Sequence, residues 1–534
     1  MAETEVLQRN LLRRGTVGDV LRRNSKVYPD KKAIIYYYPD SRIAQYTYKE
    51  LNSASNRLAN ALMSLGIKRG DRIAVFSHNC FQYMMCYFAG FKIGVAVVPM
   101  NFMLKGKEIG YIINHSESRM FVVEDSLIET VQQVAEKMPS IEYYSSINLT
   151  GKPKPNGWLD FDELCSGKYP DVEPEVEIED EDMATLNYTS GTEALPKGVM
   201  TSHKNYYSTT ISWILSEMTG TGDNYLSIIP LYHVGGGILQ TTFLFTGATS
   251  VMSYIPNPAQ MLELIHKHKV TVLVLPPALY TAMSQAPGFE KSDLSSMERC
   301  LSFGGLIQRP AIETWNREAP HIRWGSYWGQ GELSPLGICG MFNKIEDIPN
   351  QDLRWIGKPL STLETKLVDD NDNEVSPGTI GEIVARSPSV MLGYYKNEEK
   401  TKETFRNGWH HTGDFAVMDE EGNYYFVDRK KDIVKTGGEN VSSYEVEELL
   451  FKHPKVANVA IIGLPDPYWG EAVTACIVPL PGMSVEKEEI IQFCKENLAG
   501  FKVPKHVFVT DEIPMNPSGK ILKRVLREKY KNEV

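Results

Sequence analysis

Short apolar runs typical of strands alternate along most of the chain with amphipathic stretches typical of helices. This pattern predicts strands at residues 72–76, 119–123 and 270–275, and helices at residues 79–91, 127–137 and 258–269. Strands that alternate with helices favour sheets whose faces are covered by helices. We therefore expect an α/β fold with a large N-terminal domain made of several subdomains.

A second pattern begins near Asp428, where Lys430-Lys431-Asp432 follows the strand-like residues 423–427. It predicts helices at residues 443–452 and 484–498, and strands at residues 456–463 and 472–479. A chain of 534 residues is too long for one core and suits a large domain joined to a smaller one. We therefore place the large domain at residues 1–430 and a small, mobile α+β domain at residues 431–534.

The most apolar stretch, residues 79–100, is the candidate for a membrane span. Gln82 and Lys92 interrupt it, and Gly90 and Gly94 divide it. A buried helix followed by a strand at residues 94–99 accounts for these residues better than a span does. We therefore expect no integral membrane segment.

The composition narrows the classes of protein to which this chain can belong. A hydrophobic content of 42% and a charged content of 23% are ordinary for a globular protein. The net charge of −11 argues against a nucleic-acid partner, because surfaces that bind nucleic acid are usually basic. The seven Cys include no C-x-x-C pair, which favours a reducing compartment. We see no secretory signal or transit peptide, so we expect a cytoplasmic location. A homodimer is left open.

The stretch at residues 187–200 carries the strongest signal for chemistry. Thr189-Ser190-Gly191-Thr192 is followed at short range by Pro196-Lys197-Gly198. The glycines allow a tight turn whose backbone N–H groups point into one concavity, while the hydroxyls and Lys197 add donors and positive charge. Such a loop fits a polyphosphate, although its spacing is not that of G-x-x-x-x-G-K-[ST]. A surface turn rich in Ser, Thr and Gly is the alternative.

Six further motifs follow this loop in sequence, and the resemblance that they carry extends over nearly the whole chain. With these motifs the chain resembles the adenylate-forming superfamily. That superfamily includes acyl-CoA and aryl-CoA synthetases, luciferases and peptide-synthetase adenylation domains. Its phosphate loop reads roughly Thr-Ser-Gly-Thr-Thr-Gly-x-Pro-Lys-Gly. The motifs, in the order of the family, are Phe303-Gly304-Gly305, Tyr327-Trp328-Gly329-Gln330-Gly331-Glu332, Trp409-His410-His411-Thr412-Gly413-Asp414, Asp428-Arg429-Lys430-Lys431-Asp432, Lys435-Thr436-Gly437-Gly438-Glu439-Asn440-Val441 and Pro517-Ser518-Gly519-Lys520.

The resemblance implies an ATP-dependent acid–CoA ligase with a hinge at Lys431. Such an enzyme adenylates a carboxylate, releases pyrophosphate and then forms a thioester with CoA, with Mg²⁺ as cofactor. The carboxylate and the triphosphate are both anions, so the site has to supply positive charge, a metal and in-line placement. Two alternatives are a fatty acyl-AMP ligase that loads a carrier protein and a non-catalytic homologue that kept the fold. Because no carrier segment follows Lys520, free CoA is the simplest acceptor.

The resemblance also assigns roles to individual residues. Catalytic roles fall on Lys520, which contacts the carboxylate and α-phosphate, on Glu332 as the Mg²⁺ ligand, and on Lys197. The nucleotide and CoA are assigned to Thr189, Ser190, Gly191, Thr192, Gly304, Gly305, Trp328, Gly329, Gln330, Asp414, Arg429, Gly437 and Gly438. Simpler explanations exist for several of them: Glu332 is one of 67 acidic residues, Lys520 lies in a basic tail, and a tight turn needs Gly437-Gly438 as much as a pantetheine tunnel does.

Three departures from the family affect phosphate-contacting segments. Glu193-Ala194 replaces Thr-Gly in the loop, Gly331 replaces the Thr that precedes the Glu, and Trp328 replaces a Tyr. A carboxylate near a triphosphate is unfavourable unless it points away or meets Mg²⁺. These changes affect the expected affinity for ATP.

The segment Pro230-Leu-Tyr-His-Val-Gly-Gly-Gly237 matches the part of the family that borders the acid. Amino-acid-activating relatives carry an Asp there, whereas this chain has Tyr232-His233, so an amino acid is an unsuitable substrate. We expect Gly235, Gly236 and Gly237 to leave space, and Ile238, Leu239 and Phe303 to form an apolar lining. A fatty or aryl acid is therefore expected.

Overall fold

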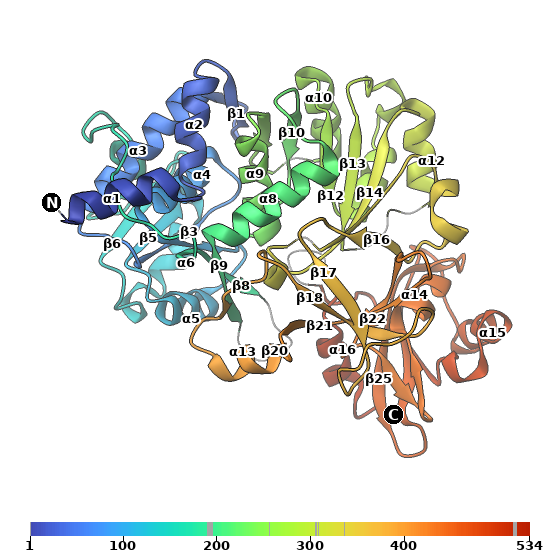
Figure 1. The fold of residues 1–534 in the computed structure, drawn as a ribbon. Helices are drawn as coiled ribbons and strands as arrows, with labels where there is room; N and C mark the ends of the chain where they lie inside the picture. Colours follow the sequence, from blue (N-terminus) through green and yellow to red (C-terminus); the bar gives the residue numbers. More distant parts are fainter. Residues whose placement is uncertain are drawn as a thin grey trace. The chain divides into compact units, whose positions relative to one another are not determined.

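The computed structural model describes residues 2–189, 196–255, 257–304, 307, 309–335, 337–515 and 521–533. The chain forms two compact units, one of Met1–Glu364 with Arg386–His410 and one of Thr365–Ala385 with His411–Val534 (Figure 1). The smaller unit thus takes in strands that precede residue 431. The domain boundary at 430 and the hinge at Lys431 stay predictions.

The first sheet of the larger unit combines parallel and antiparallel strand pairs. β1, β11, β10, β12, β13 and β14 are joined by parallel ladders, whereas β2, β15 and β16 pair antiparallel with their neighbours. Its strands, in spatial order, are β16 (Trp355–Pro359), β15 (Ile338–Phe342), β14 (Arg323–Trp328), β13 (Arg299–Phe303), β12 (Val272–Leu275), β10 (Asn224–Ser227), β11 (Thr249–Ser253), β1 (Lys32–Tyr37) and β2 (Ile43–Thr47).

The second sheet of the larger unit brings the phosphate-loop strands to one side of a parallel core. β3 pairs parallel with both β4 and β5, and β8 joins the antiparallel hairpin partner β9. Its strands, in spatial order, are β19 (Gly393–Tyr394), β9 (Lys197–Ser202), β8 (Met183–Thr189), β4 (Ala96–Met100), β3 (Arg72–Phe76), β5 (Met120–Glu124), β6 (Tyr143–Ile147) and β7 (Leu159–Asp160).

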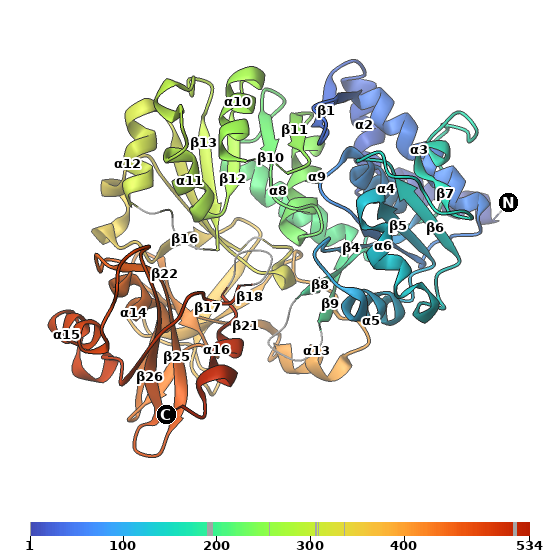
Figure 2. The same cartoon turned by 180° about the vertical axis from the view of Figure 1, so that it is seen from behind.

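Helices cover these sheets, as the alternating pattern predicts. In the view from behind, α10, α11 and α12 lie beside β12 and β13 (Figure 2). The larger unit contains β20 (Phe405–Arg406) and the helices α1 (Ala2–Arg13), α2 (Asp19–Val27), α3 (Tyr48–Ser64), α4 (Phe81–Ile93), α5 (Gly106–Ser116), α6 (Ile128–Gln132), α7 (Phe161–Leu164), α8 (His203–Glu217), α9 (Val234–Phe245), α10 (Pro258–His268), α11 (Pro277–Ser284), α12 (Arg309–Glu318) and α13 (Glu398–Thr404).

Local sequence signals explain where several helices start. Thr47 and Glu50 form a capping box at α3, and Ser202 with Asn205 does the same at α8. Asn257 caps α10, whose first residue is Pro258, as helix starts favour. The helix predicted at residues 127–137 is shorter than expected: α6 ends at Gln132, because Val134 has a non-helical φ of −129°.

The apolar stretch at residues 79–100 is buried inside the larger unit. Every residue of α4 is buried, and β4 beside it is buried throughout. The predicted pairing of a buried helix with a strand is therefore confirmed. Within the described ranges, no helix has the length and apolar character that a membrane crossing requires.

The smaller unit holds two groups of strands. The first is ordered β17 (Glu364–Val368), β18 (Gly381–Arg386), β21 (Trp409–Met418) and β22 (Tyr424–Arg429). The second has β24 (Glu439–Val441), β23 (Val434–Thr436), β26 (Gly470–Pro479) and β25 (Val456–Asp466), with β27 (His506–Val509) on β26. α14 (Ser443–Leu450), α15 (Lys487–Asn497) and α16 (Lys523–Tyr530) complete the predicted α+β pattern.

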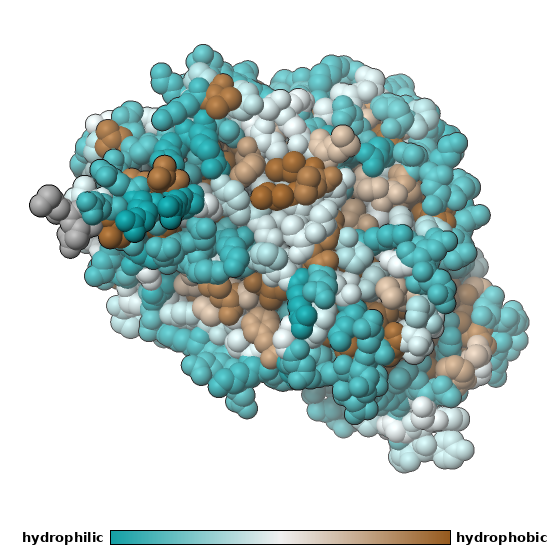
Figure 3. Space-filling view, in the orientation of Figure 1, coloured by the Kyte–Doolittle hydropathy of each residue, from teal (hydrophilic) through white to brown (hydrophobic). Residues whose placement is uncertain are grey.

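The outer face of α8 exposes an apolar strip (Figure 3). Ile211 is 41% exposed, Leu215 60% and Met218 78%, with the spacing of one helix face. The opposite face of α8 is buried and ends at Glu217.

Glu217 is a buried carboxyl group beneath β14. It is 1% exposed, Tyr327 donates a hydrogen bond to Oε1, and Cys339 Sγ lies 3.7 Å from the same oxygen. Burial raises the pKa of Glu217 to about 7, although the charges of Arg299 and Arg323 act in the opposite direction. The folded protein therefore binds a proton at Glu217 at a pH where an unfolded chain does not.

This proton makes stability depend on pH. Since the folded pKa of about 7 lies above the ordinary 4.5, the stabilising proton is fully present below pH 4.5 and is lost as pH rises through 7. The Glu217→Gln side chain stays neutral and does not lose this stabilisation as the pH rises. The difference in free energy of unfolding, variant minus wild type, should therefore increase from pH 5 to pH 8, by about 3 kcal/mol at most. Urea unfolding at both pH values tests this, with the exposed Glu318→Gln as control. Equal pH slopes in all three proteins would contradict it.

Candidate active site

The predicted phosphate loop connects two paired strands, β8 and β9. Thr189 is the last residue of β8 and lies opposite Lys197, the first residue of β9. Both residues are half-buried, and the ladder fixes their separation. Ser190, Gly191 and Thr192 lie outside the described residues, as do Glu193 and Ala194. The structure therefore locates the two ends of the loop.

Glu332 is held close to this loop by a residue that the motifs did not single out. Glu332 lies in a 3-10 turn, Gly331–Leu333, directly after β14. The Tyr394 hydroxyl donates a hydrogen bond of 2.8 Å to its Oε1. Tyr394 lies opposite Val199 in the β19–β9 pairing, and its ring centroid is 5.7 Å from Lys197 Nζ. Tyr394 thus joins Glu332 to Lys197, and only the fold reveals this contact.

The motif around Trp328 packs closely against backbone. A Cβ on Gly329 would overlap the carbonyl oxygen of Pro335, so only glycine fits there. Trp328 is buried, with 6% exposed, and Gln330 precedes the 3-10 turn. A Cβ on Gly331 would lie 3.5 Å from Thr189 Cγ2, which is ordinary contact. Gly331 therefore adjoins the start of the phosphate loop, and the described residues around it leave room for a side chain.

The predicted acid pocket lies at the start of α9. His233 caps this helix, since its Nδ1 accepts a hydrogen bond of 3.1 Å from Gly235 N. Its ring centroid is 6.5 Å from that of Phe303, and Phe303 packs on a cluster that contains Leu239. Tyr232 is half-buried and packs on the core cluster that contains Ile238. The structure thus brings His233 and Phe303 together, whereas Ile238 belongs to another part of the core.

The expectation that three consecutive glycines leave space in this pocket is wrong. A Cβ on Gly236 would overlap the carbonyl oxygen of Pro230, and one on Gly237 would lie 2.9 Å from the Tyr87 hydroxyl. A Cβ on Gly235 would be 3.2 Å from His233 Nδ1. These glycines let α9 approach the preceding turn and α4 closely. Gly236 is therefore needed for packing, and its predicted contact with the acid stays a prediction.

Gly304 differs from these glycines. Its φ is +75°, and no atom of the described residues lies within 4 Å of the position that a Cβ would take. The backbone conformation, and not crowding, is therefore what favours glycine here. The open space beside Gly304 is consistent with a ligand plane close to the backbone. Gly305 lies outside the described residues.

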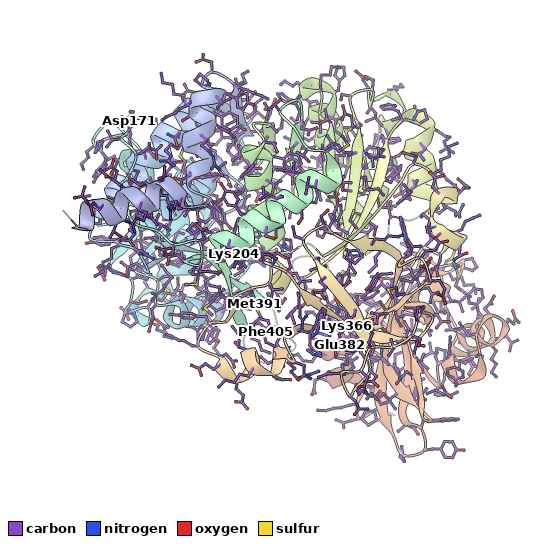
Figure 4. All side chains as sticks on the ribbon, in the orientation of Figure 1. Asp171, Lys204, Lys366, Glu382, Met391 and Phe405 are labelled. Carbon is purple, nitrogen blue, oxygen red and sulfur yellow. The ribbon has the colours of Figure 1, made fainter. Side chains whose placement is uncertain are left out.

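Asp414 and Arg429 lie opposite each other on β21 and β22 of the smaller unit. Arg429 Nε is 3.5 Å from Asp414 Oδ1, and Asp414 is 5% exposed. Glu382 on β18, labelled in Figure 4, accepts a hydrogen bond of 3.0 Å from Gly413 N. The two predicted nucleotide residues are thus paired across a ladder. Their roles toward ATP stay predictions.

Other members of these later motifs have structural roles. Asp428 Oδ2 accepts a hydrogen bond of 2.6 Å from Ser443 N and so fastens the start of α14. Gly437-Gly438 forms the two-residue turn between β23 and β24, with φ of +59° and +86°. Such a turn needs positive φ at both positions, which is sufficient reason for two glycines. Their predicted contact with pantetheine stays a prediction.

Lys520 lies outside the described residues, which resume at Ile521. Met515 and Ile521 form an isolated antiparallel bridge. α16 follows, and Lys523 Nζ forms an ion pair of 2.7 Å with Glu447. Lys523, one of the lysines in the basic tail, therefore has a structural partner.

Comparison with known proteins identifies the family. Residues 21–395 match the model of the AMP-binding enzyme family, and residues 445–520 match that of the AMP-binding enzyme C-terminal domain. The chain belongs to the AMP-binding enzyme family. The resemblance inferred from the seven motifs is thereby confirmed.

Relatives of this AMP-binding enzyme extend over almost its whole length. It is 34% identical to 4-hydroxybutyrate–CoA ligase 2 of Metallosphaera sedula over 522 residues, which cover 96% of this chain and 94% of that protein. It is 31% identical to crotonobetaine/carnitine–CoA ligase of Proteus mirabilis over 519 residues, or 94% and 97% of the two chains. Among solved structures, the anthranilate CoA ligase AuaEII in complex with anthranoyl-AMP has a TM-score of 0.87 at 28% identity, covering 97% and 98%.

This AMP-binding enzyme is an ATP-dependent acid–CoA ligase. It adenylates a carboxylic acid with release of pyrophosphate and then transfers the acyl group to CoA. The fold of a large α/β unit and a small C-terminal unit agrees with the solved structures of such enzymes.

The space beside Gly331 leads to a test of ATP binding. Gly331→Thr places a hydroxyl next to Thr189 without overlap with any described residue, and a hydrogen bond from it to a phosphate oxygen should tighten ATP binding about tenfold. Calorimetry with ATP and Mg²⁺ measures the dissociation constant. Gly331→Val is the matched control, because it has the same shape and no hydroxyl. Equal affinities for the Thr and Val variants would contradict the prediction.

Proposed function

We propose that the acid substrate of this ligase has an apolar alkyl or aryl body. The supporting observation is the pairing of His233 with Phe303 beside Leu239, in a segment that carries no carboxylate to hold an α-amino group. An uncharged, half-buried wall of this kind favours apolar groups. The proposal covers fatty and aryl acids and excludes amino acids.

Release of pyrophosphate tests this proposal directly. The purified protein is supplied with ATP, Mg²⁺, CoA and one acid at a time, from a series of short, medium and long alkyl acids, aromatic acids and amino acids. We expect turnover with at least one alkyl or aromatic acid, together with formation of its CoA thioester. Turnover with amino acids alone would overturn the proposal.

We further propose that Lys197 and Glu332 act on the phosphates of ATP. Lys197 supplies a positive charge at the base of the phosphate loop, where the β- and γ-phosphates would lie. Glu332 offers a hard carboxylate oxygen, because Tyr394 engages Oε1 while Oε2 has no hydrogen-bond partner within the described ranges. A single carboxylate is typical of Mg²⁺ sites that share the ion with phosphates. The ion, when bound, would neutralise phosphate charge.

Tyr394 acts in this proposal as a positioning residue for Glu332. Removing its hydroxyl frees the carboxylate to rotate, so Tyr394→Phe should raise the Mg²⁺ concentration that half-saturates adenylation, by about tenfold. Thioester formation from a supplied acyl-adenylate should change less than about twofold. Tyr395→Phe is the control, because the Tyr395 hydroxyl contacts Glu117 instead, at 3.3 Å. An unchanged Mg²⁺ requirement in Tyr394→Phe would exclude this role.

Lys520 is proposed to act in adenylation only. It is the Lys of the Pro517-x-Gly519 motif, and the charge it would stabilise develops in the first step. Lys520→Ala should lower the rate of adenylation about 10²–10³-fold and leave thioester formation from a supplied acyl-adenylate largely intact. Arg524→Ala, which alters an exposed cation of the same tail, serves as control. Equal losses in both half-reactions would rule out this division of roles.

The remaining proposals concern the setting of the enzyme. All seven Cys are free thiols, which supports a cytoplasmic, reducing location. Asp414 and Arg429 are proposed to bind the nucleotide. A homodimer and a hinge at Lys431 remain part of the proposal.

A further inference from the structure

The β8–β9 hairpin has two different faces at the base of the phosphate loop. Thr189 and Lys197 are directly opposite each other in the ladder, so their side chains lie on one face. Tyr188 and Gly198 form the next pair, which belongs to the other face, because successive residues of a strand alternate. The hairpin therefore carries the residues predicted to meet the phosphates on one face, and Tyr188 points away from them.

Helix α5 lies against the face that carries Tyr188 (Figure 2). Two of its side chains, Tyr111 and His115, are one helical turn apart, and their rings stack with centroids 5.4 Å apart and planes at 24°. The Tyr188 ring meets both of them edge-on, at 6.5 Å from Tyr111 and at 5.7 Å from His115. This packing fixes the directions in which the polar atoms of Tyr111 and His115 point.

Tyr111 holds the arm of the hairpin that leads into Lys197. Its hydroxyl donates a hydrogen bond of 3.2 Å to the carbonyl oxygen of Pro196. Pro196 adjoins the last described pair of the β8–β9 ladder, and as a proline it has no N–H with which to extend that ladder. Because a peptide unit is planar, holding the Pro196 carbonyl also holds the plane that contains the nitrogen and Cα of Lys197. The hydrogen bond therefore restrains the direction in which the Lys197 side chain leaves the backbone.

His115 holds the other arm, through the residue that precedes Thr189. Its Nδ1 is 2.7 Å from the Tyr188 hydroxyl. Burial, followed by the charge of Lys396, lowers the pKa of His115, and burial raises the pKa of Tyr188, so both groups are neutral near pH 7. The contact is thus a hydrogen bond between neutral groups. Within the described residues, α5 therefore holds both arms of the hairpin through two neighbouring side chains.

The two hydrogen bonds are not what attaches α5 to the sheet. Tyr111 and Tyr188 both pack on an apolar core cluster that contains Ile112 of α5 and Leu186 of β8. A phenylalanine at either tyrosine would keep these apolar contacts, which supply most of the packing energy. The contribution of the hydroxyl groups is therefore directional: they set the positions of the two arms relative to α5.

We propose that Tyr111 and His115 are positioning residues for the phosphate end of the active site. They act from behind the hairpin and keep Lys197 and Thr189 in place before ATP binds, so that less order has to be imposed on binding. The benefit applies to the triphosphate and not to AMP, because AMP lacks the β- and γ-phosphates that Lys197 would meet. This inference rests on the proposed function of Lys197.

Removal of single hydroxyl groups tests the inference. Tyr111→Phe and Tyr188→Phe each keep the ring and lose one hydrogen bond, so each should weaken ATP binding about fivefold and change AMP binding by less than about twofold. Calorimetry with Mg²⁺ and without an acid substrate measures both dissociation constants in the absence of turnover. Tyr395→Phe is the matched control, because its ring also meets His115 but its hydroxyl contacts Glu117. Thermal unfolding checks that the variants are folded.

A double-mutant cycle asks whether Tyr111 acts through Lys197. Lys197→Ala alone should weaken ATP binding. Adding Tyr111→Phe to Lys197→Ala should then change the dissociation constant by less than about twofold, because the group that Tyr111 positions is gone. A disturbance of the general fold would instead add its full effect in both backgrounds.

The possible outcomes are distinct. Unchanged ATP binding in Tyr111→Phe would exclude the role of Tyr111, and unchanged binding in Tyr188→Phe would exclude that of His115. Equal losses of ATP and AMP binding, or a fivefold effect of Tyr111→Phe that persists in the Lys197→Ala background, would overturn the inference as a whole. Lys197→Ala that binds ATP as tightly as the native protein would contradict the proposed role of Lys197 itself, and thereby this inference as well.

Discussion

The antiparallel pairing of β19 with β9 is the constraint on which the phosphate side of the site depends. β9 starts at Lys197, and β19 carries Tyr394, whose hydroxyl reaches Glu332 in the turn after β14. Three segments that are distant in sequence are thus fixed by one two-residue strand. Because a ladder has a defined register, it fixes the backbone position of Tyr394 beside β9, and the Tyr394 hydroxyl in turn holds the Glu332 carboxylate. Such prior placement is what electrostatic catalysis of phosphoryl chemistry requires.

Close approach of backbone to backbone is a second constraint on the walls of the site. Gly329 lies against Pro335, and Gly236 lies against Pro230, with no room for a Cβ in either case. These contacts bring β14 and α9 into positions that larger residues would prevent. Gly304 and Gly331 are different, because the described residues leave space beside both. Glycine in a motif therefore indicates two opposite things, dense packing or open space, and only the three-dimensional structure separates them.

Much of the fold could be predicted from hydrophobic periodicity and motifs, because the helices and strands they indicate are determined by residues close together in the sequence. The strand predicted at residues 72–76 is β3, the helix predicted at 258–269 is α10, and the buried nature of α4 followed from its interrupted apolar run. The pairing of Asp414 with Arg429 could not be foreseen, because the register of β21 and β22 decides it. Tyr394 and the His78–Glu124 contact were missed for the same reason: their partners lie far away in sequence. No local pattern marks them.

Tyr394 and His78 solve the same physical problem at two places in the larger unit. Each is an aromatic side chain whose ring is immobilised by packing or pairing, so that one polar atom is presented in one direction. Ordering such a ring in advance removes most of the conformational entropy that a flexible donor or acceptor loses on binding. Tyr394 has Glu332 as its partner, and His78 has Glu124. The five hydrogen bonds on Glu124 hold its buried carboxylate in place, and the one from Nδ1 fixes the orientation of the His78 ring.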